Sequence, residues 1–179
     1  MHGPTPTSVP GGRTVTTEDV VRLIRSRRPF LTLDVLGGPE TLPGAVPVAA
    51  ASAPGSFDDA TQREFGRFLE RATGGDRRLP LLLYCQSVQC WMSYNAALRA
   101  IDLGHSEVLW YRGGIEAWKM AGMRTVPPGA GFGPGRPSVQ GPGPLGPNPG
   151  QSRPNPPSPG GQAYGPGGGE YPVDTDVRY

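Results

Sequence analysis

The chain has 179 residues, of which 28 are glycine and 23 are proline. This length permits one globular domain with appendages, and so much glycine and proline cannot be spread through a packed core. The formal net charge of +2 is small, which argues against a nucleic-acid surface or a polybasic membrane patch. No stretch approaches the roughly 20 apolar residues of a membrane span.

Composition divides the chain into three parts. About half of residues 127–179 are proline or glycine, so we expect a disordered tail. Residues 1–13 are expected to form a flexible N-terminal segment, and residues 14–126 one α/β domain. The start of the chain lacks the basic and apolar blocks of a secretory signal, which predicts a cytoplasmic protein. If the sequence is a fragment of an exported protein, the periplasm is the alternative.

Helix and strand patterns alternate in the first half of the domain. A helix is predicted over residues 17–27, capped by Thr16 or Thr17, with acidic residues in its first turn. Residues 30–35 are nearly all apolar, as in a strand that is buried on both faces. Residues 45–50 form a weaker strand, and a helix capped at Ser56 follows and ends at Gly74.

The second half repeats the alternation more clearly. Residues 81–84 are the best core strand, and a helix runs from about Trp91 to a stop at Gly104. Residues 107–111 form the next strand, and a short helix follows the Gly113-Gly114 pair. Such alternation predicts a small, mostly parallel sheet with helices on both faces.

Cys85 stands at the carboxyl end of the 81–84 strand, where sites gather in open α/β sheets. Backbone N–H groups of residues 86–91 and the helix dipole can converge there on an anion. We therefore expect a lowered pKa for Cys85 and a nucleophilic thiolate. The two cysteines and the separated His2 and His105 complete no metal site, so neither a metal nor a cofactor is predicted.

Several segments resemble rhodanese-like domains. Residues 81–87 are similar to the active-site strand and loop of that family, and residues 108–118 to its closing Gly-Gly-x-x-x-Trp element. Asp34-Val35 and residues 42–45 resemble two earlier landmarks, so that the resemblance covers about residues 14–126. More narrowly, residues 90–97 are similar to bacterial rhodanese-like proteins that are named for a Cys-x-x-Cys-Trp motif and associated with quinoprotein-dependent catabolism.

The resemblance implies a sulfurtransferase or persulfide carrier. Cys85 would take a sulfane sulfur from a donor such as thiosulfate and pass it to a thiol acceptor. Cys90 would be a resolving thiol, and a protein partner is a further possibility. The expected substrate-binding residues lie in the loop and at the end of the neighbouring strand: Gln86, Ser87, Val88, Gln89, Trp91 and Arg112.

The loop departs from the family pattern. Active rhodanese loops carry glycine and arginine three and five residues after the cysteine, where this chain has Val88 and Cys90. Arg112 is the nearest candidate to replace that charge, and the absence of a loop arginine also argues against phosphatase chemistry. The alternative function is a catalytically degenerate module for protein interaction or redox sensing. Cys90 then remains a resolving thiol, a disulfide partner or a small core residue.

Overall fold

The structure is a computed structural model that describes residues 3–129. Within this range the strands form one parallel sheet in the order β1-β5-β4-β2-β3. The strands are β1 (Arg13–Thr14), β2 (Leu31–Asp34), β3 (Val46–Pro47), β4 (Leu81–Tyr84) and β5 (Val108–Tyr111). The helices are α1 (Thr17–Arg25), α2 (Ala60–Thr73), α3 (Met92–Asp102) and α4 (Gly114–Met120), with a 3₁₀ turn η1 (Ala49–Ser52).

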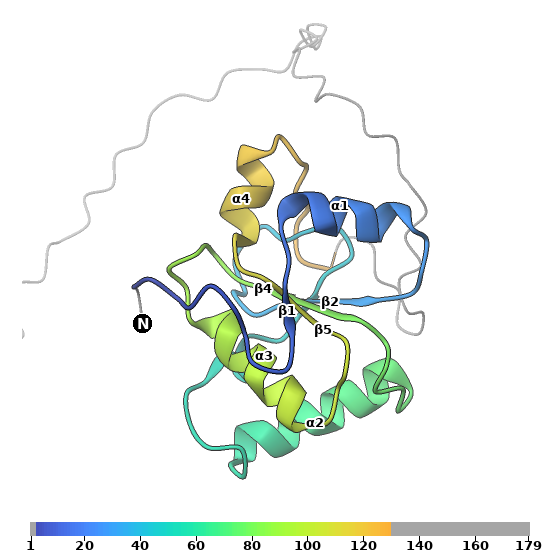
Figure 1. The fold of residues 1–179 in the computed structure, drawn as a ribbon, viewed down its shortest axis with the longest axis vertical. Coiled ribbons are helices and arrows are strands. Elements are labelled where there is room, and N and C mark those ends of the chain that lie inside the picture. The colour runs from blue at the N-terminus through green and yellow to red at the C-terminus, as the bar shows by residue number, and fades with distance from the viewer. Residues whose placement is uncertain (1–2, 130–179) are drawn as a thin grey trace, which may run out of the picture. The chain divides into compact units, whose positions relative to one another are not determined.

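The three longest strands, β2, β4 and β5, are buried along their whole length because helices cover both faces of the sheet (Figure 1). Successive side chains of a strand point to opposite faces. In β4, Leu82 and Tyr84 pack in the core beneath α1 and α4, whereas Leu81 and Leu83 pack in the core beneath α2 and α3. The expected α/β arrangement, a small parallel sheet with helices on both faces, is therefore confirmed.

Local chemistry explains where the helices begin. Thr16 caps α1 in a capping box with Asp19, whose pKa falls to about 2 because it accepts hydrogen bonds from the Thr16 backbone and from Arg22. The predicted cap of α2 at Ser56 is wrong. Asp59 caps that helix by accepting the N–H of Gln62, while the Ser56 carbonyl accepts a hydrogen bond from Arg99.

Two strands differ from the prediction. The strand expected over residues 45–50 contains only Val46–Pro47. The Val48 N–H still donates to the Asp34 carbonyl, but the backbone leaves the extended conformation at Val48 and turns into η1. Strand β1 pairs Arg13 and Thr14 with β5 and was not predicted, because two residues are too short to show a period.

The structure bears differently on the predictions for the two ends of the chain. Residues 3–13, expected to be flexible, contact the domain, with Thr5 and Val9 buried. Of the tail expected to be disordered, all but residues 127–129 lies outside the described residues. Among residues 3–129, no helix combines the length and the apolar character needed to cross a membrane.

Candidate functional site

The candidate site lies where the middle strand, β4, ends and the chain enters the loop before α3. Parallel, in-register pairing of β2, β4 and β5 brings the carboxyl ends of these strands to one edge of the sheet. Cys85 is the first residue after β4, and Arg112 is the first residue after β5. The topology thus places both residues at the edge that the sequence predicts.

The start of α4 closes over Cys85. The backbone N–H of Ile115 donates to the Cys85 carbonyl at 2.9 Å, and that of Glu116 donates to the Gln86 carbonyl at 3.1 Å. Gly114 has φ +62°, and a Cβ at this position would lie 2.3 Å from the Cys85 carbonyl oxygen. Only glycine accommodates both the left-handed backbone and this close approach, which explains the glycine at Gly114.

The Cys85 sulfur is enclosed by hydrogen-bonding groups. Its residue is 1% exposed, its thiol donates to the Cys90 carbonyl at 3.2 Å, and its Sγ lies 3.1 Å from Ser93 Oγ. The indole N–H of Trp110 donates to the same Ser93 oxygen at 2.9 Å. Since the thiol hydrogen points to Cys90, the Ser93 hydroxyl is left as the donor toward sulfur.

These surroundings favour the protonated thiol. A hydrogen bond with the Cys90 side chain, followed by burial, raises the pKa of Cys85, whereas the Ser93 hydroxyl and backbone N–H act in the opposite direction. The net pKa lies above the ordinary range, contrary to the expected lowering. Donation at the start of α3 is thus present at Ser93, but the neighbouring thiol and desolvation outweigh it.

Cys90 lies against Cys85 and also forms part of the core. It is 3% exposed, belongs to the same buried cluster as Cys85, and is not joined to it in a disulfide. The Cys85 thiol donates to the Cys90 backbone carbonyl, so the two residues are in direct contact. The structure therefore brings together the two residues expected to act as nucleophile and resolving thiol.

The intervening loop residues bond to their surroundings. The Gln86 side chain donates to Glu116 at 2.8 Å, and the Ser87 carbonyl accepts the Cys90 N–H at 3.0 Å. Val88 is 41% exposed, and Gln89 is exposed as well.

Two predicted binding residues remain, Trp91 and Arg112. Trp91 contacts an aromatic ring, and Arg112 makes hydrogen bonds to Thr5. Trp91 is half-buried and packs edge-to-face on Tyr94, with ring centroids 5.5 Å apart. Arg112 donates through Nε to Thr5 Oγ1 and through Nη2 to the Thr5 carbonyl, both at 3.0 Å. The Thr5 hydroxyl in turn donates to the Val88 carbonyl. Arg112 thus reaches the cysteine loop through Thr5.

Sequence reasoning missed Ser93, Trp110 and Thr5. Ser93 offered a faint signal, as a small polar residue within the apolar face of a helix just after the cysteine loop. Thr5 offered none, because its role depends on contacts with residues more than eighty positions away.

Two other polar residues play no direct part at the sulfur. His105 follows the carboxyl end of α3, whereas Cys85 lies at its amino end, so the two do not pair. Asp34 accepts the N–H groups of Leu36 and Gly37, as a buried carboxylate at the end of β2 is expected to do. Across residues 3–129, no three His, Cys, Asp or Glu side chains gather as metal ligands do.

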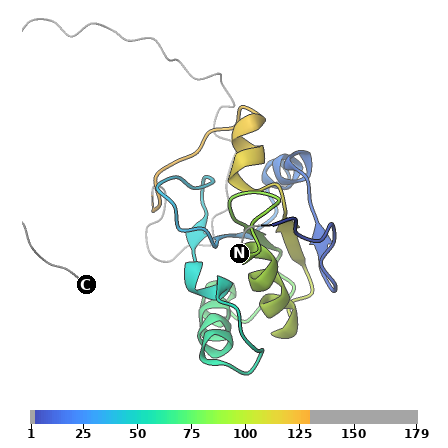
Figure 2. The same ribbon diagram turned by 90° about the vertical axis from the view of Figure 1, so that its left-hand side faces the viewer.

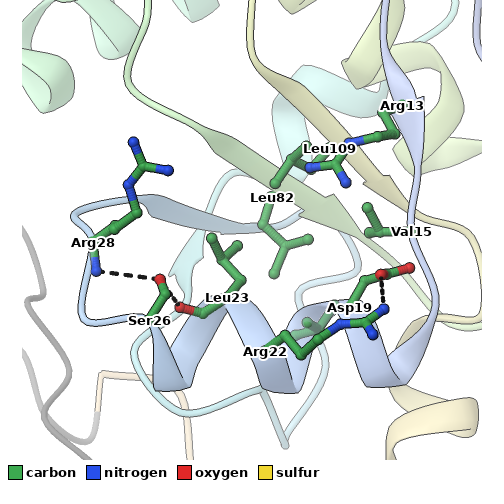
Figure 3. A pocket seen from close by; sticks show the side chains of 10 residues that line it. Arg13, Val15, Asp19, Arg22, Leu23, Ser26, Arg28, Leu82 and Leu109 are labelled. Atoms are coloured by element: carbon green, nitrogen blue, oxygen red, sulfur yellow. Dashed lines mark hydrogen bonds and ion pairs between the residues drawn. The ribbon is translucent and has the colours of Figure 1, made fainter.

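A separate pocket of about 250 Å³ lies between α1 and the sheet (Figure 3). Leu23, Leu82 and Leu109 line its interior, and Arg13 and Arg28 extend from opposite sides of it. None of the predicted site residues lines this pocket, so it is distinct from the Cys85 site.

A parallel α/β sheet with a cysteine after its middle strand, closed by a Gly-Gly turn, defines a cysteine-loop α/β domain. Residues 29–121 match the rhodanese-like domain family, and the chain belongs to that family. No curated protein matches the chain significantly.

Solved structures to which this chain is similar include thiosulfate sulfurtransferase from Pseudomonas aeruginosa, at 20% identity and a TM-score of 0.48, covering 64% of this chain and 20% of that one. A yeast protein tyrosine phosphatase of the rhodanese family has 20% identity and a TM-score of 0.48, with 63% and 88% covered. A rhodanese-like domain from Anabaena has 18% identity and a TM-score of 0.47, with 69% and 85% covered. The chain thus spans only a fifth of the Pseudomonas enzyme.

Proposed function

We propose that the domain is a sulfurtransferase or persulfide carrier in which Cys85 accepts a sulfane sulfur and Cys90 resolves it. The observation that carries the proposal is the contact between the two buried cysteines at the carboxyl end of β4, where the Cys85 thiol donates to the Cys90 carbonyl at 3.2 Å. The Ser93 hydroxyl, 3.1 Å from Cys85 Sγ, adds a donor that stabilises negative charge on that sulfur. Membership of the rhodanese-like family supports the same reaction class.

The chemistry balances with a sulfane donor and thiols. The Cys85 thiolate attacks the outer sulfur of the donor, forms a persulfide and releases the remainder of the donor as an anion, which is sulfite when the donor is thiosulfate. Cys90, as thiolate, then attacks Cys85 Sγ, expels sulfide and leaves a disulfide between the two cysteines. The sulfane sulfur is thereby reduced and two thiols are oxidised. Two external thiols restore the dithiol.

The raised pKa of Cys85 sets a condition on this cycle. The thiolate is the nucleophile, so the resting thiol must first lose its proton. Because burial contributes to the raised pKa, exposure of the sulfur would favour that loss. We therefore expect reaction with a donor to be slow at neutral pH and to accelerate as the pH rises.

Mass spectrometry after incubation with thiosulfate, or with a small-molecule persulfide, tests the proposal. The Cys90→Ser protein should accumulate one added sulfur on Cys85, because its resolving thiol is missing. The wild type should pass on to the disulfide, and the Cys85→Ser protein should show neither product. Absence of the adduct from Cys90→Ser protein, while the urea-unfolded chain reacts with the same donor, would reject Cys85 as the acceptor.

The second candidate function is a catalytically degenerate rhodanese module that binds a protein partner or senses redox state. The burial and raised pKa of Cys85 and the lack of any charged side chain in residues 85–91 favour it. A disulfide that forms in defined thiol redox buffers, without any sulfur adduct in the preceding experiment, would indicate redox sensing. Full biological function of Cys85→Ser protein would indicate a binding role that does not use the thiol.

Within the family, we propose a relationship to the bacterial Cys-x-x-Cys-Trp proteins. Its support is the Cys90-Trp91 pair and the run of residues 90–97, although four residues separate the two cysteines here. Phosphatase activity is not proposed, because residues 85–91 contain no arginine to clamp a phosphate.

A further inference from the structure

Residues 3–9, called the strap below, lie along the cysteine loop. The backbone N–H of Gly3 donates to the Gln89 carbonyl, and that of Thr5 donates to the Val88 carbonyl, both at 3.1 Å. The Thr5 hydroxyl donates to the same Val88 oxygen at 2.6 Å. Figure 2 shows the N-terminal end of the chain beside the loop that leads into α3. The strap therefore ties down the segment that encloses Cys85.

Burial divides the strap into an anchored part and a removable part. Val9 is 3% exposed and packs in the same core cluster as Cys85 and Cys90. Among residues 3–8, only Thr5 is buried, at 5% exposed, whereas Thr7 and Ser8 are exposed. Release of the first strap residues therefore costs a few hydrogen bonds but leaves the Val9 contact in place.

Thr5 also accepts two hydrogen bonds from Arg112. The guanidinium gives one Nε hydrogen and one Nη2 hydrogen to Thr5, side by side, as it would to two oxygens of an anion. Residues 85–91 have no charged side chain, so Arg112 is the cation that the carboxyl end of the adjacent strand β5 offers to this site. While Thr5 is bound, those two donors are unavailable to an anionic reactant.

We propose that the strap is a closing device, in which Thr5 is the positioning residue that shields Cys85 and withholds Arg112 from anions. Release of residues 3–7 frees the Val88 and Gln89 carbonyls, loosens the loop and turns Arg112 toward incoming anionic reactants. The inference rests on the reactive role of Cys85 proposed above, but its test requires no persulfide.

The test compares alkylation of Cys85 by neutral iodoacetamide and by anionic iodoacetate in the full chain, read by peptide mass at one pH near 8.5, the ordinary pKa of a thiol. Thr5→Val removes the two hydrogen bonds made by Oγ1. When the strap closes faster than Cys85 is alkylated, the alkylation rate is proportional to the population of the form with the strap released. Two hydrogen bonds of ordinary strength predict a rise of roughly ten- to a hundredfold with iodoacetamide. The rise with iodoacetate should be larger, because freed Arg112 attracts the anion.

Matched variants separate gating from unfolding. Thr7→Val makes the same change at an exposed strap residue and should leave both rates unchanged. Thr5→Val combined with Arg112→Gln should keep fast alkylation but lose the preference for iodoacetate. Unfolding would instead expose Cys90 together with Cys85 and favour neither reagent. Unchanged rates in Thr5→Val, or equal increases with both reagents, would overturn the inference. If Thr5→Val accelerates alkylation as expected but no sulfur adduct forms on Cys85, the proposed transfer reaction is rejected and the inference about the strap still holds.

Discussion

Ser93 Oγ lies 3.1 Å from Cys85 Sγ and joins the first turn of α3 to the end of β4. Trp110 holds this hydroxyl from the neighbouring strand, β5. The sulfur therefore faces one side-chain donor whose position is fixed by two elements of the core. Its acidity depends on the balance between that donor and the Cys90 thiol.

Replacing Ser93 by alanine should move ionisation of Cys85 to higher pH, because the hydroxyl favours the thiolate. One lost hydrogen bond predicts alkylation about three- to tenfold slower at a given alkaline pH. The measurement is the pH profile of iodoacetamide modification, read at Cys85. Ser87→Ala serves as the control, since the Ser87 hydroxyl contacts the Gln89 N–H rather than the sulfur. Coincident profiles for Ser93→Ala and wild type would contradict the assignment.

Gly114→Ala should destabilise the domain by several kcal/mol and disturb the cysteine loop. The new Cβ would meet the Cys85 carbonyl at 2.3 Å, in addition to the strain of a positive φ. Gly122→Ala is a matched control, because Gly122 has φ +70° and no atom within 4 Å of the added carbon. It should cost only about 1–2 kcal/mol. Urea unfolding of both variants measures the difference, and equal losses would mean that the close approach is unimportant.

The free energy of unfolding should fall as the pH rises above about 8.5. There the Cys85 thiol of the unfolded chain ionises, while its raised pKa keeps it protonated in the folded chain. The folded state then binds more protons, and stability falls by at most about 1.4 kcal/mol per pH unit. Urea unfolding between about pH 7.5 and 9.5 should show a smaller slope for Cys85→Ser. The range ends before tyrosines ionise near pH 10.

Arg99→Leu should destabilise the domain by about 3 kcal/mol or more, because it strips partners from a buried network. The Arg99 guanidinium donates to the Ala53 and Ser56 carbonyls and to both carboxylate oxygens of Asp59, at 2.8–3.0 Å. Arg67→Leu, at an exposed position of α2, should change stability by less than about 0.5 kcal/mol. Thermal unfolding of the two variants provides the comparison, and equal midpoints would refute the importance of the network.

The sequence by itself determined the order of the main elements and the position of Cys85. Apolar runs such as residues 81–84, helical periodicity and the helix stop at Gly104 are local patterns, and local patterns reflect burial and backbone freedom directly. Alternation of strand and helix then implied a parallel sheet, so that Cys85 and Arg112 could be placed at the same edge.

The tertiary structure alone decided the surroundings of the sulfur. The pKa of Cys85 is raised because Cys90 and burial outweigh Ser93, and that balance depends on side-chain positions that no spacing specifies. Thr5 and Arg112 are 107 residues apart in sequence, yet they share two hydrogen bonds. Local propensity carries no information about such a pair, because only the packing of the N-terminal segment beside β5 and the cysteine loop brings them together.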